Sequence, residues 1–297
     1  MHQAVLLQEV IDSLDIKSYD TVVDVTFGGG GHSRAVCEKL SSNGVLVAID
    51  TDLQALETHR KSFGGYGAKV HFVHSNFRNL DIVLRNLGIK KVNKFIFDLG
   101  FSSTQLEESG GGLSFKKNEP LLMTLTDSMT KDTLTAKRIV NEWSVEQIET
   151  IIRGYGEESF SKRIAKGIVD ARKDKEIETT DDLRKIILNS TPAWYQHRKI
   201  DPSTKTFQAL RIAVNDEIET VKEGLEKAFS FLSSGGRIAV ITFHSIEDRA
   251  VKRMFREWKN MDLGTQEPKK PIIPSRDEIK ENHRARSAKL RTFIKKI

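Results

Sequence analysis

The chain has 297 residues, of which 38% are hydrophobic and 30% are charged, so a sizeable folded core is expected and a wholly disordered chain is not. Its single cysteine, Cys37, excludes an internal disulfide framework and a cysteine-based zinc cluster, and no metal site is expected. The 47 Lys and Arg residues against 41 Asp and Glu residues give a net charge of +6, which permits a nucleic-acid partner without establishing one. No stretch is apolar enough to span a bilayer, and the N-terminus lacks a secretory signal, so a cytoplasmic protein is expected.

The first hundred residues alternate between two hydrophobic periods. Short β-branched or apolar runs predict strands, and segments with helical spacing lie between them. The predicted strands are 21–25, 45–49, 70–73 and 95–97, and the predicted helices are 33–40 and 52–62. This alternation predicts an α/β fold with a doubly wound parallel sheet.

The pattern changes after residue 99. Residues 99–132 show no clear period, residues 133–189 have helical signals, and residues 194–202 have none. A long helix is then predicted from Phe207 to Leu232, followed by a strand at 237–243 and, after Trp258, a basic tail. We therefore expect an α/β domain formed by residues 1–110 and 201–297, interrupted by a helical insertion at 111–200.

A glycine-rich loop, DVTFGGGGH at residues 24–32, joins the first predicted strand to the first predicted helix. Doubly wound folds bind nucleotides at this edge, and glycines let a ligand approach the backbone closely. Asp50 ends the next predicted strand, where a carboxylate can accept both ribose hydroxyl protons of an adenosine ligand.

Two ligand classes share this arrangement, and a sharp turn without a ligand is the third possibility. Asp24 would repel the pyrophosphate of a dinucleotide, and Ser33 stands where the third glycine of a G-x-G-x-x-G motif belongs. An acid at this place suits the ammonium and sulfonium groups of S-adenosylmethionine better. The residues therefore favour S-adenosylmethionine over NAD.

Asp98 and Cys37 bear on the chemistry. Asp98 ends the predicted strand 95–97, where it could hold a substrate amine or the amino-acid end of the cofactor; an Asx-turn or helix cap is an equal alternative. Cys37 follows apolar Val36 within a predicted helix, as a buried core residue would. For a base methyltransferase, this favours attack by a nitrogen or oxygen over attack by a ring carbon activated by a thiolate.

Several ordered motifs resemble those of the bacterial methyltransferases that modify the N4 amine of a cytosine in small-subunit (16S) ribosomal RNA. The resemblance runs nearly end to end. The motifs are the loop at 24–33, DLGFSS at 98–103 with Gln105, YGEE at 155–158 with KRIA at 162–165, TFQALR at 206–211 with Asn215, FHSIEDR at 243–249 and RARS at 284–287.

The resemblance implies a Rossmann-like S-adenosylmethionine-dependent methyltransferase fold with an inserted helical domain, and a ribosomal RNA or assembled small subunit as the partner. The implied cofactor site consists of Gly30, Gly31, His32, Asp50, Phe77, Asp98 and Gln105. Asp98 is also the candidate catalytic residue, because an acceptor beside the exocyclic amine helps it to lose a proton. Phe77 would face the adenine; its residue type alone suggests core packing.

Six basic residues are candidates for contacts with RNA phosphates, although an ordinary solvated surface would have the same composition. They are Lys162, Arg163, Lys166, Arg249, Arg284 and Arg286. Where the family usually has an acid and an arginine, this chain has Leu122 and Thr124. This departure motivates the alternative of a non-catalytic RNA-binding assembly factor, whereas a small-molecule methyltransferase is disfavoured by the helical insertion and the basic tail.

Overall fold

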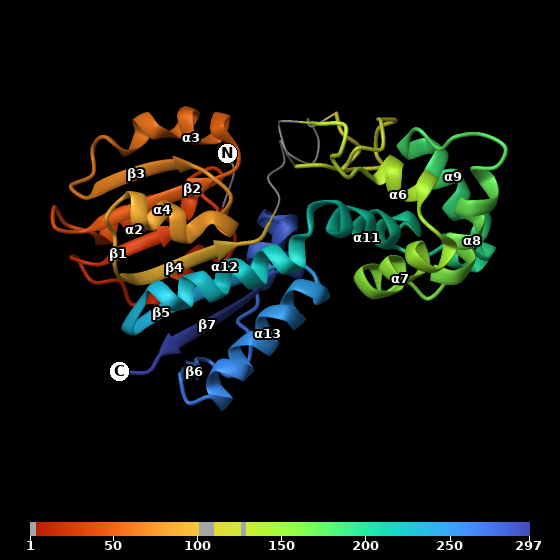
Figure 1. Cartoon of the computed structure of the whole chain (residues 1–297). Coiled ribbons are helices and arrows are strands. Elements are labelled where there is room, and N and C mark those ends of the chain that lie inside the picture. Colours follow the sequence, from red (N-terminus) through yellow and green to blue (C-terminus); the bar gives the residue numbers. More distant parts are fainter. Residues whose placement is uncertain (1–3, 101–109, 126–128) are drawn as a thin grey trace. The chain divides into compact units, whose positions relative to one another are not determined.

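The computed structural model describes residues 4–100, 110–125 and 129–297 (Figure 1). The chain divides into two compact units. The first is formed by residues 1–100 together with 218–297, and the second by residues 101–217. Within the described ranges, none of the helices has the length and apolarity needed to cross a membrane.

The first unit is built on a seven-stranded sheet in the order β3-β2-β1-β4-β5-β7-β6. Its strands are β1 (Thr21–Asp24), β2 (Val45–Asp50), β3 (Lys69–His74), β4 (Val92–Asp98), β5 (Leu232–Thr242), β6 (Gly264–Gln266) and β7 (Lys289–Lys295). The five strands from β3 to β5 are parallel, and β7 and β6 add antiparallel pairings at one side. This is the predicted doubly wound α/β fold, with an antiparallel addition typical of mixed sheets.

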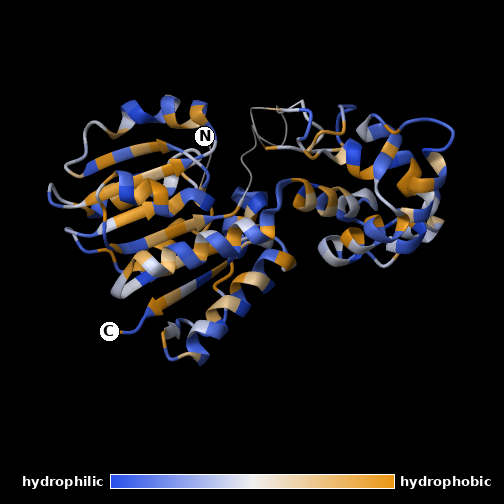
Figure 2. Ribbon diagram, viewed as in Figure 1, coloured by the Kyte–Doolittle hydropathy of each residue, from blue (hydrophilic) through white to orange (hydrophobic). Residues whose placement is uncertain are grey.

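Helices cover both faces of this sheet. They are α1 (Leu7–Leu14), α2 (Gly31–Lys39), α3 (Leu53–Arg60), α4 (Leu80–Asn86), α12 (Glu217–Phe231), α13 (Ser245–Asn260) and α14 (Arg276–Glu281). Successive strand residues point to opposite faces, so Val22 packs in the core under α1–α3 while Val23 packs in the core under α4, α12 and α13. Figure 2 shows hydrophobic residues gathered along these strands, as burial on both faces requires.

The second unit is helical. Its helices are α6 (Ala136–Glu142), α7 (Val145–Gly156), α8 (Ser161–Ala171), α9 (Thr180–Ser190), α10 (Ala193–Gln196) and α11 (Ser203–Asn215). One apolar cluster joins α6, α7, α8, α9 and α11, with Ile152 of α7, Ile164 of α8 and Leu210 of α11 all fully buried. The short α10 overlaps segment 194–202, for which no helix is predicted.

The helix predicted between Phe207 and Leu232 is in fact two helices, α11 and α12. The chain breaks at Asp216, whose φ of 48° lies in the left-handed region. Asp tolerates that region better than most residues, and the Asn215 side chain donates to the Met123 carbonyl beside it. Because α11 packs in the helical core through Phe207 and Leu210, the second unit extends to residue 217, past the expected boundary at 200.

The expected basic tail is also wrong in part, because the C-terminal residues are folded. Strand β7 pairs antiparallel with β5 and also with β6. Its Arg291 is only 4% exposed and donates to both carboxylate oxygens of Asp248 on α13, at 2.7 and 3.2 Å. At least one of the basic residues that suggest a C-terminal tail, Arg291, is therefore part of a buried ion pair.

Candidate active site

Three carboxylates end three neighbouring parallel strands: Asp24 ends β1, Asp50 ends β2 and Asp98 ends β4. Since β1 lies between β2 and β4, all three lie at one edge of the sheet. This is the edge at which open α/β sheets bind their ligands. Each carboxylate has a different environment, and hence a different capacity to meet a ligand.

The glycine loop between β1 and α2 combines positive φ angles with close packing. Gly30 has a φ of 71°, and a Cβ there would lie 2.9 Å from the Phe27 ring. A Cβ on Gly31 would lie 2.7 Å from the Cβ of Ala4. Packing within the chain therefore explains the glycines at 30 and 31. Gly28, by contrast, has a φ of 49° and almost open space around it, so its backbone can be approached by a ligand.

Asp24 is buried beneath this loop. Its carboxylate accepts hydrogen bonds from the Ser33 hydroxyl at 2.7 Å and the Thr26 N–H at 3.1 Å. Burial raises the pKa of Asp24, and the electrostatic effect of His32 and the hydrogen bonds from Ser33 and Thr26 oppose this shift. Asp24, the acid predicted to favour a cationic ligand, thus stabilises the glycine loop through these two hydrogen bonds.

Asp50 is half-buried and holds the loop from the side. One carboxylate oxygen accepts from the Gly28 N–H at 2.6 Å and the other accepts from the Asp52 N–H at 2.9 Å. Burial raises the pKa of Asp50, against the lowering effect of these two hydrogen bonds. Each oxygen keeps acceptor capacity, as binding of a diol would require.

Asp98 faces His32, an arrangement that the sequence did not predict. His32 Nε2 lies 3.0 Å from the Val5 carbonyl oxygen, which can only accept, so Nε2 carries a hydrogen. Nδ1 then faces Asp98 Oδ2 at 3.7 Å. Burial raises the pKa of Asp98, while the electrostatic effect of His32 and the hydrogen bond from the Gly100 N–H oppose this shift. With its side chain 22% exposed, Asp98 can still be reached from solvent.

The remaining residues of the implied cofactor site are Phe77, His32 and Gln105. Phe77 is half-buried with its ring edge-on to Phe97, 5.7 Å between centroids, and a Cβ on Gly224 of α12 would lie 2.6 Å from it. Phe77 thus belongs partly to the core, and its role towards an adenine stays a prediction. The His32 side chain is buried. Gln105 lies outside the described residues.

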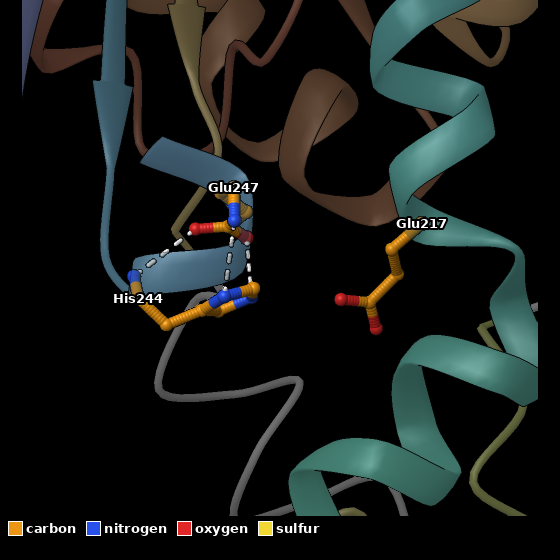
Figure 3. A group of neighbouring side chains, drawn as sticks. All are labelled: Glu217, His244 and Glu247. Atoms are coloured by element: carbon orange, nitrogen blue, oxygen red, sulfur yellow. Dashed lines mark hydrogen bonds and ion pairs between the residues drawn. The ribbon is translucent and has the colours of Figure 1, made fainter. Parts of the chain in front are cut away.

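The segment after β5 lies next to Asp98. A Cβ on Gly100 would lie 2.8 Å from the Phe243 ring and 3.2 Å from Asp98 Oδ1, so Phe243 packs beside the β4 end. His244 and Glu247 then form a capping box at the start of α13, as Figure 3 shows, and the Glu247 carboxylate accepts the Phe243 N–H at 2.9 Å. Only the resemblance had pointed to this motif.

A pocket of about 310 Å³ opens beside the same segment. Its lining includes Phe243, His244 and Lys289, the apolar Ile273, Pro274 and Ile279, and Arg286. Lys289 also pairs with Asp248 at 3.3 Å. The predicted phosphate contact Arg286 therefore lines a concave site, in contrast to an evenly solvated surface.

The remaining basic candidates lie on helical surfaces. Lys162, Arg163 and Lys166 are exposed on one face of α8, where Lys166 also pairs with Asp170 at 3.8 Å. Arg249 is exposed on α13, and Arg284 is half-buried in a 3₁₀ turn at 283–287. The exposed side chains among them can reach a phosphate, and the role of all five residues in RNA binding stays a prediction.

Two further expectations can be compared with the structure. Cys37 is buried in α2, and burial raises the pKa of its thiol to about 12, so it does not supply a thiolate. Leu122 and Thr124 are half-buried, and the Leu122 N–H donates to the Gly111 carbonyl oxygen at 3.1 Å. The two departures from the family pattern thus fall outside the fully buried core.

The comparison with known protein families finds a family model that spans almost the whole chain. The model of the MraW methylase family matches residues 1–296. The chain belongs to the MraW methylase family. Its fold is that of Rossmann-like methyltransferases, and its methyl donor is S-adenosylmethionine.

Curated relatives align with almost the whole chain. Two proteins named Ribosomal RNA small subunit methyltransferase H, from Clostridium botulinum strains Kyoto (type A2) and 657 (type Ba4), are each 42% identical over 309 aligned positions. Each alignment covers 99% of this chain and 98% of the relative. Among solved structures, an rRNA methylase from Streptococcus thermophilus covers 100% of this chain and 99% of its own at 13% identity, with a TM-score of 0.47.

Proposed function

We propose that this chain transfers a methyl group from S-adenosylmethionine to the N4 amine of a cytosine in small-subunit ribosomal RNA. The observation that supports it best is the juxtaposition of Asp50, the open Gly28 backbone and Asp98 at one edge of the sheet. Membership in a methylase family and relatives named as small-subunit ribosomal RNA methyltransferases support the same activity.

The described residues fit this cofactor. Asp50 has acceptor capacity for the ribose hydroxyls, and the Gly28 backbone is approachable. Burial raises the pKa of the buried Asp24 and of the partly exposed Asp98, so a cation nearby would be stabilising, since it would favour the ionised forms of both carboxyls. When bound, S-adenosylmethionine supplies an electrophilic methyl group on a positively charged sulfur.

Asp98 would orient the target amine and accept its proton. The lone pair of an exocyclic cytosine amine is conjugated with the ring, so a hydrogen-bond acceptor helps the nitrogen to become pyramidal. The raised pKa of Asp98 makes it a better proton acceptor than an ordinary carboxylate at the end of the reaction. The Gly100 N–H, which donates to Asp98 Oδ1 at 3.2 Å, would hold its orientation. The target base must be unpaired or flipped out to reach this edge.

The direct experiment incubates the protein with labelled S-adenosylmethionine and bacterial small ribosomal subunits, and maps the modified nucleoside by mass spectrometry. We expect N4-methylcytidine in the small-subunit RNA. Tight RNA binding without transfer to subunits, free RNA or assembly intermediates would instead favour a non-catalytic assembly factor. Methyl transfer to a small molecule, with none to RNA, would favour a small-molecule methyltransferase.

We expect the Asp50 carboxylate to contribute strongly to the affinity for S-adenosylmethionine. Removing this charged acceptor in Asp50→Ala should weaken S-adenosylmethionine binding by about 10- to 100-fold, as measured by calorimetry. In the unmodified protein, cofactor at 100 times its Kd should raise the free energy of unfolding by about 2.7 kcal/mol. Equal stabilisation by NAD, or none by S-adenosylmethionine, would contradict the site.

The exposed cations of α8 predict a salt-dependent contribution to RNA affinity. Replacing Lys162, Arg163 and Lys166 by Ala should lower the slope of log affinity against log salt by about 0.7 for each single-strand phosphate that is no longer neutralised. Cofactor affinity should not change. The matched control replaces Lys90 and Lys91, which are exposed just before β4 at the opposite edge of the sheet. If both variants keep the original slope, the α8 face is ordinary solvated surface.

A further inference from the structure

An aromatic cluster on the second unit has no part in the site described above. Phe160, Trp194 and Tyr195 pack edge-to-face, with ring centroids 4.8 to 5.9 Å apart. Tyr195 is buried, whereas Trp194 is 59% exposed. Tyr and Trp are enriched at interfaces, because their rings combine a large apolar face with a polar group.

The cluster is held in place from below. The Tyr195 hydroxyl donates to the buried Glu158 carboxylate at 2.6 Å, and the other oxygen of Glu158 accepts the Phe160 N–H at 2.8 Å. Glu158 thereby fixes both ends of the cluster, the start of α8 and the α10 segment. Because its carboxylate is engaged in this way, it adds no exposed negative charge to the surface.

The cluster is bordered by cations. The Arg198 guanidinium lies 5.3 Å from the Trp194 ring centroid and 4.9 Å from that of Tyr195. The Arg163 guanidinium lies 5.9 Å from the Phe160 ring centroid, and both arginines are exposed. A nearby acid in the sequence, Asp201, is paired with Arg184 at 2.8 Å. The surface thus offers π faces and positive charge together.

We infer that Trp194, with Arg163 and Arg198, forms a stacking platform for an unpaired segment of RNA. Exposed aromatic rings bordered by arginines are how proteins bind single strands: bases stack on the ring, and guanidinium groups meet the phosphates. Bases within a duplex are stacked on one another and cannot use such a platform. The inference rests on the proposed RNA substrate and specifies a place where the helical unit binds it.

The test follows tryptophan fluorescence while a short single-stranded oligocytidylate is added to the full chain. Of the three tryptophans, Trp258 is buried and Trp143 half-buried, so Trp194 should dominate any quenching. We expect quenching by the single strand and much less by a duplex containing the same sequence. Trp194→Ala should abolish the quenching and weaken binding by about 5- to 100-fold, whereas Trp194→Phe should retain most of the affinity.

The control is Tyr19→Ala, an aromatic that is 68% exposed just before β1, which should change nothing. The inference is overturned if the single strand does not quench Trp194 or if Trp194→Ala binds as the unmodified protein does. If ribosomal subunits are still methylated in that case, the proposed function stands and the platform meets a protein or only packs. If the single strand quenches Trp194 but no methyl group is transferred, the platform stands and the proposed methyl transfer fails.

Discussion

Replacing Asp98 by Asn should lower the rate of methyl transfer by about 10²- to 10³-fold at saturating S-adenosylmethionine. The amide keeps the shape of the carboxylate and can still accept the Gly100 N–H, which now meets Asp98 Oδ1 at 3.2 Å. What it loses is the negative charge that orients the amine and the capacity to take up its proton. The measurement is single-turnover transfer to small subunits.

The pH dependence of the same reaction provides a second readout. Burial raises the pKa of Asp98, so in the unmodified protein the rate should rise with pH through a value above that of an ordinary carboxyl. In the Asp98→Asn variant, the rate should not show this rise with pH. RNA affinity should hardly change, because phosphate contacts supply it. A variant that transfers methyl groups at an unchanged rate would remove Asp98 from the chemistry.

The second large effect concerns stability. Asp248→Ala leaves the guanidinium of Arg291 buried without its partner, which should lower the free energy of unfolding by about 3–5 kcal/mol. Trp258 reports on this region, since its ring packs on Phe293 of β7 with centroids 5.2 Å apart. Denaturation followed by its fluorescence is therefore the appropriate measurement.

The contribution of Asp248 should also depend on pH. Burial alone would raise the pKa of Asp248, but the hydrogen bonds and charges of Arg291 and Lys289 outweigh it and lower the pKa. A lowered pKa stabilises the folded state above the unfolded value of about 3.9, and the gain is lost as pH falls through the folded pKa. The gap between wild type and Asp248→Ala should therefore narrow in acid.

An exposed ion pair is the control for this prediction. Asp277 is 83% exposed in its pair with Lys280 on α14, and such pairs contribute little. Asp277→Ala should unfold at the same denaturant concentration as the unmodified chain. Finding Asp248→Ala equally stable would show that Arg291 reaches solvent or another partner once Asp248 is gone.

Local patterns in the sequence were enough to predict most of the first unit. The apolar run at 45–49 and the loop at 24–32 lie as expected, because strands buried on both faces and tight glycine turns have strong local signals. The placement of Asp24, Asp50 and Asp98 at one edge followed from the parallel order alone. Their side-chain partners did not, since His32 reaches Asp98 only through the tertiary fold.

The failures share a physical cause. The break at Asp216 is invisible because the apolar stripe continues through it, and only one residue adopts the left-handed conformation. Strand β7 was hidden because Arg291 and Thr292 are buried polar residues within it, and burial there depends on the distant Asp248. In both places an interaction with residues far along the chain overrides the local period.

The arrangement of β4 and β5 has a consequence for biosynthesis. These strands pair side by side although residues 101–217 separate them, and β7 at 289–295 pairs on the other side of β5. A growing chain therefore cannot complete the methyltransferase sheet until its last strand has left the translating ribosome, whereas the contiguous helical unit can form earlier. Strand β4 presents an unpaired edge until β5 emerges, and β5 then presents one until β7 emerges. During this interval a nascent molecule is most prone to aggregation or to need a chaperone.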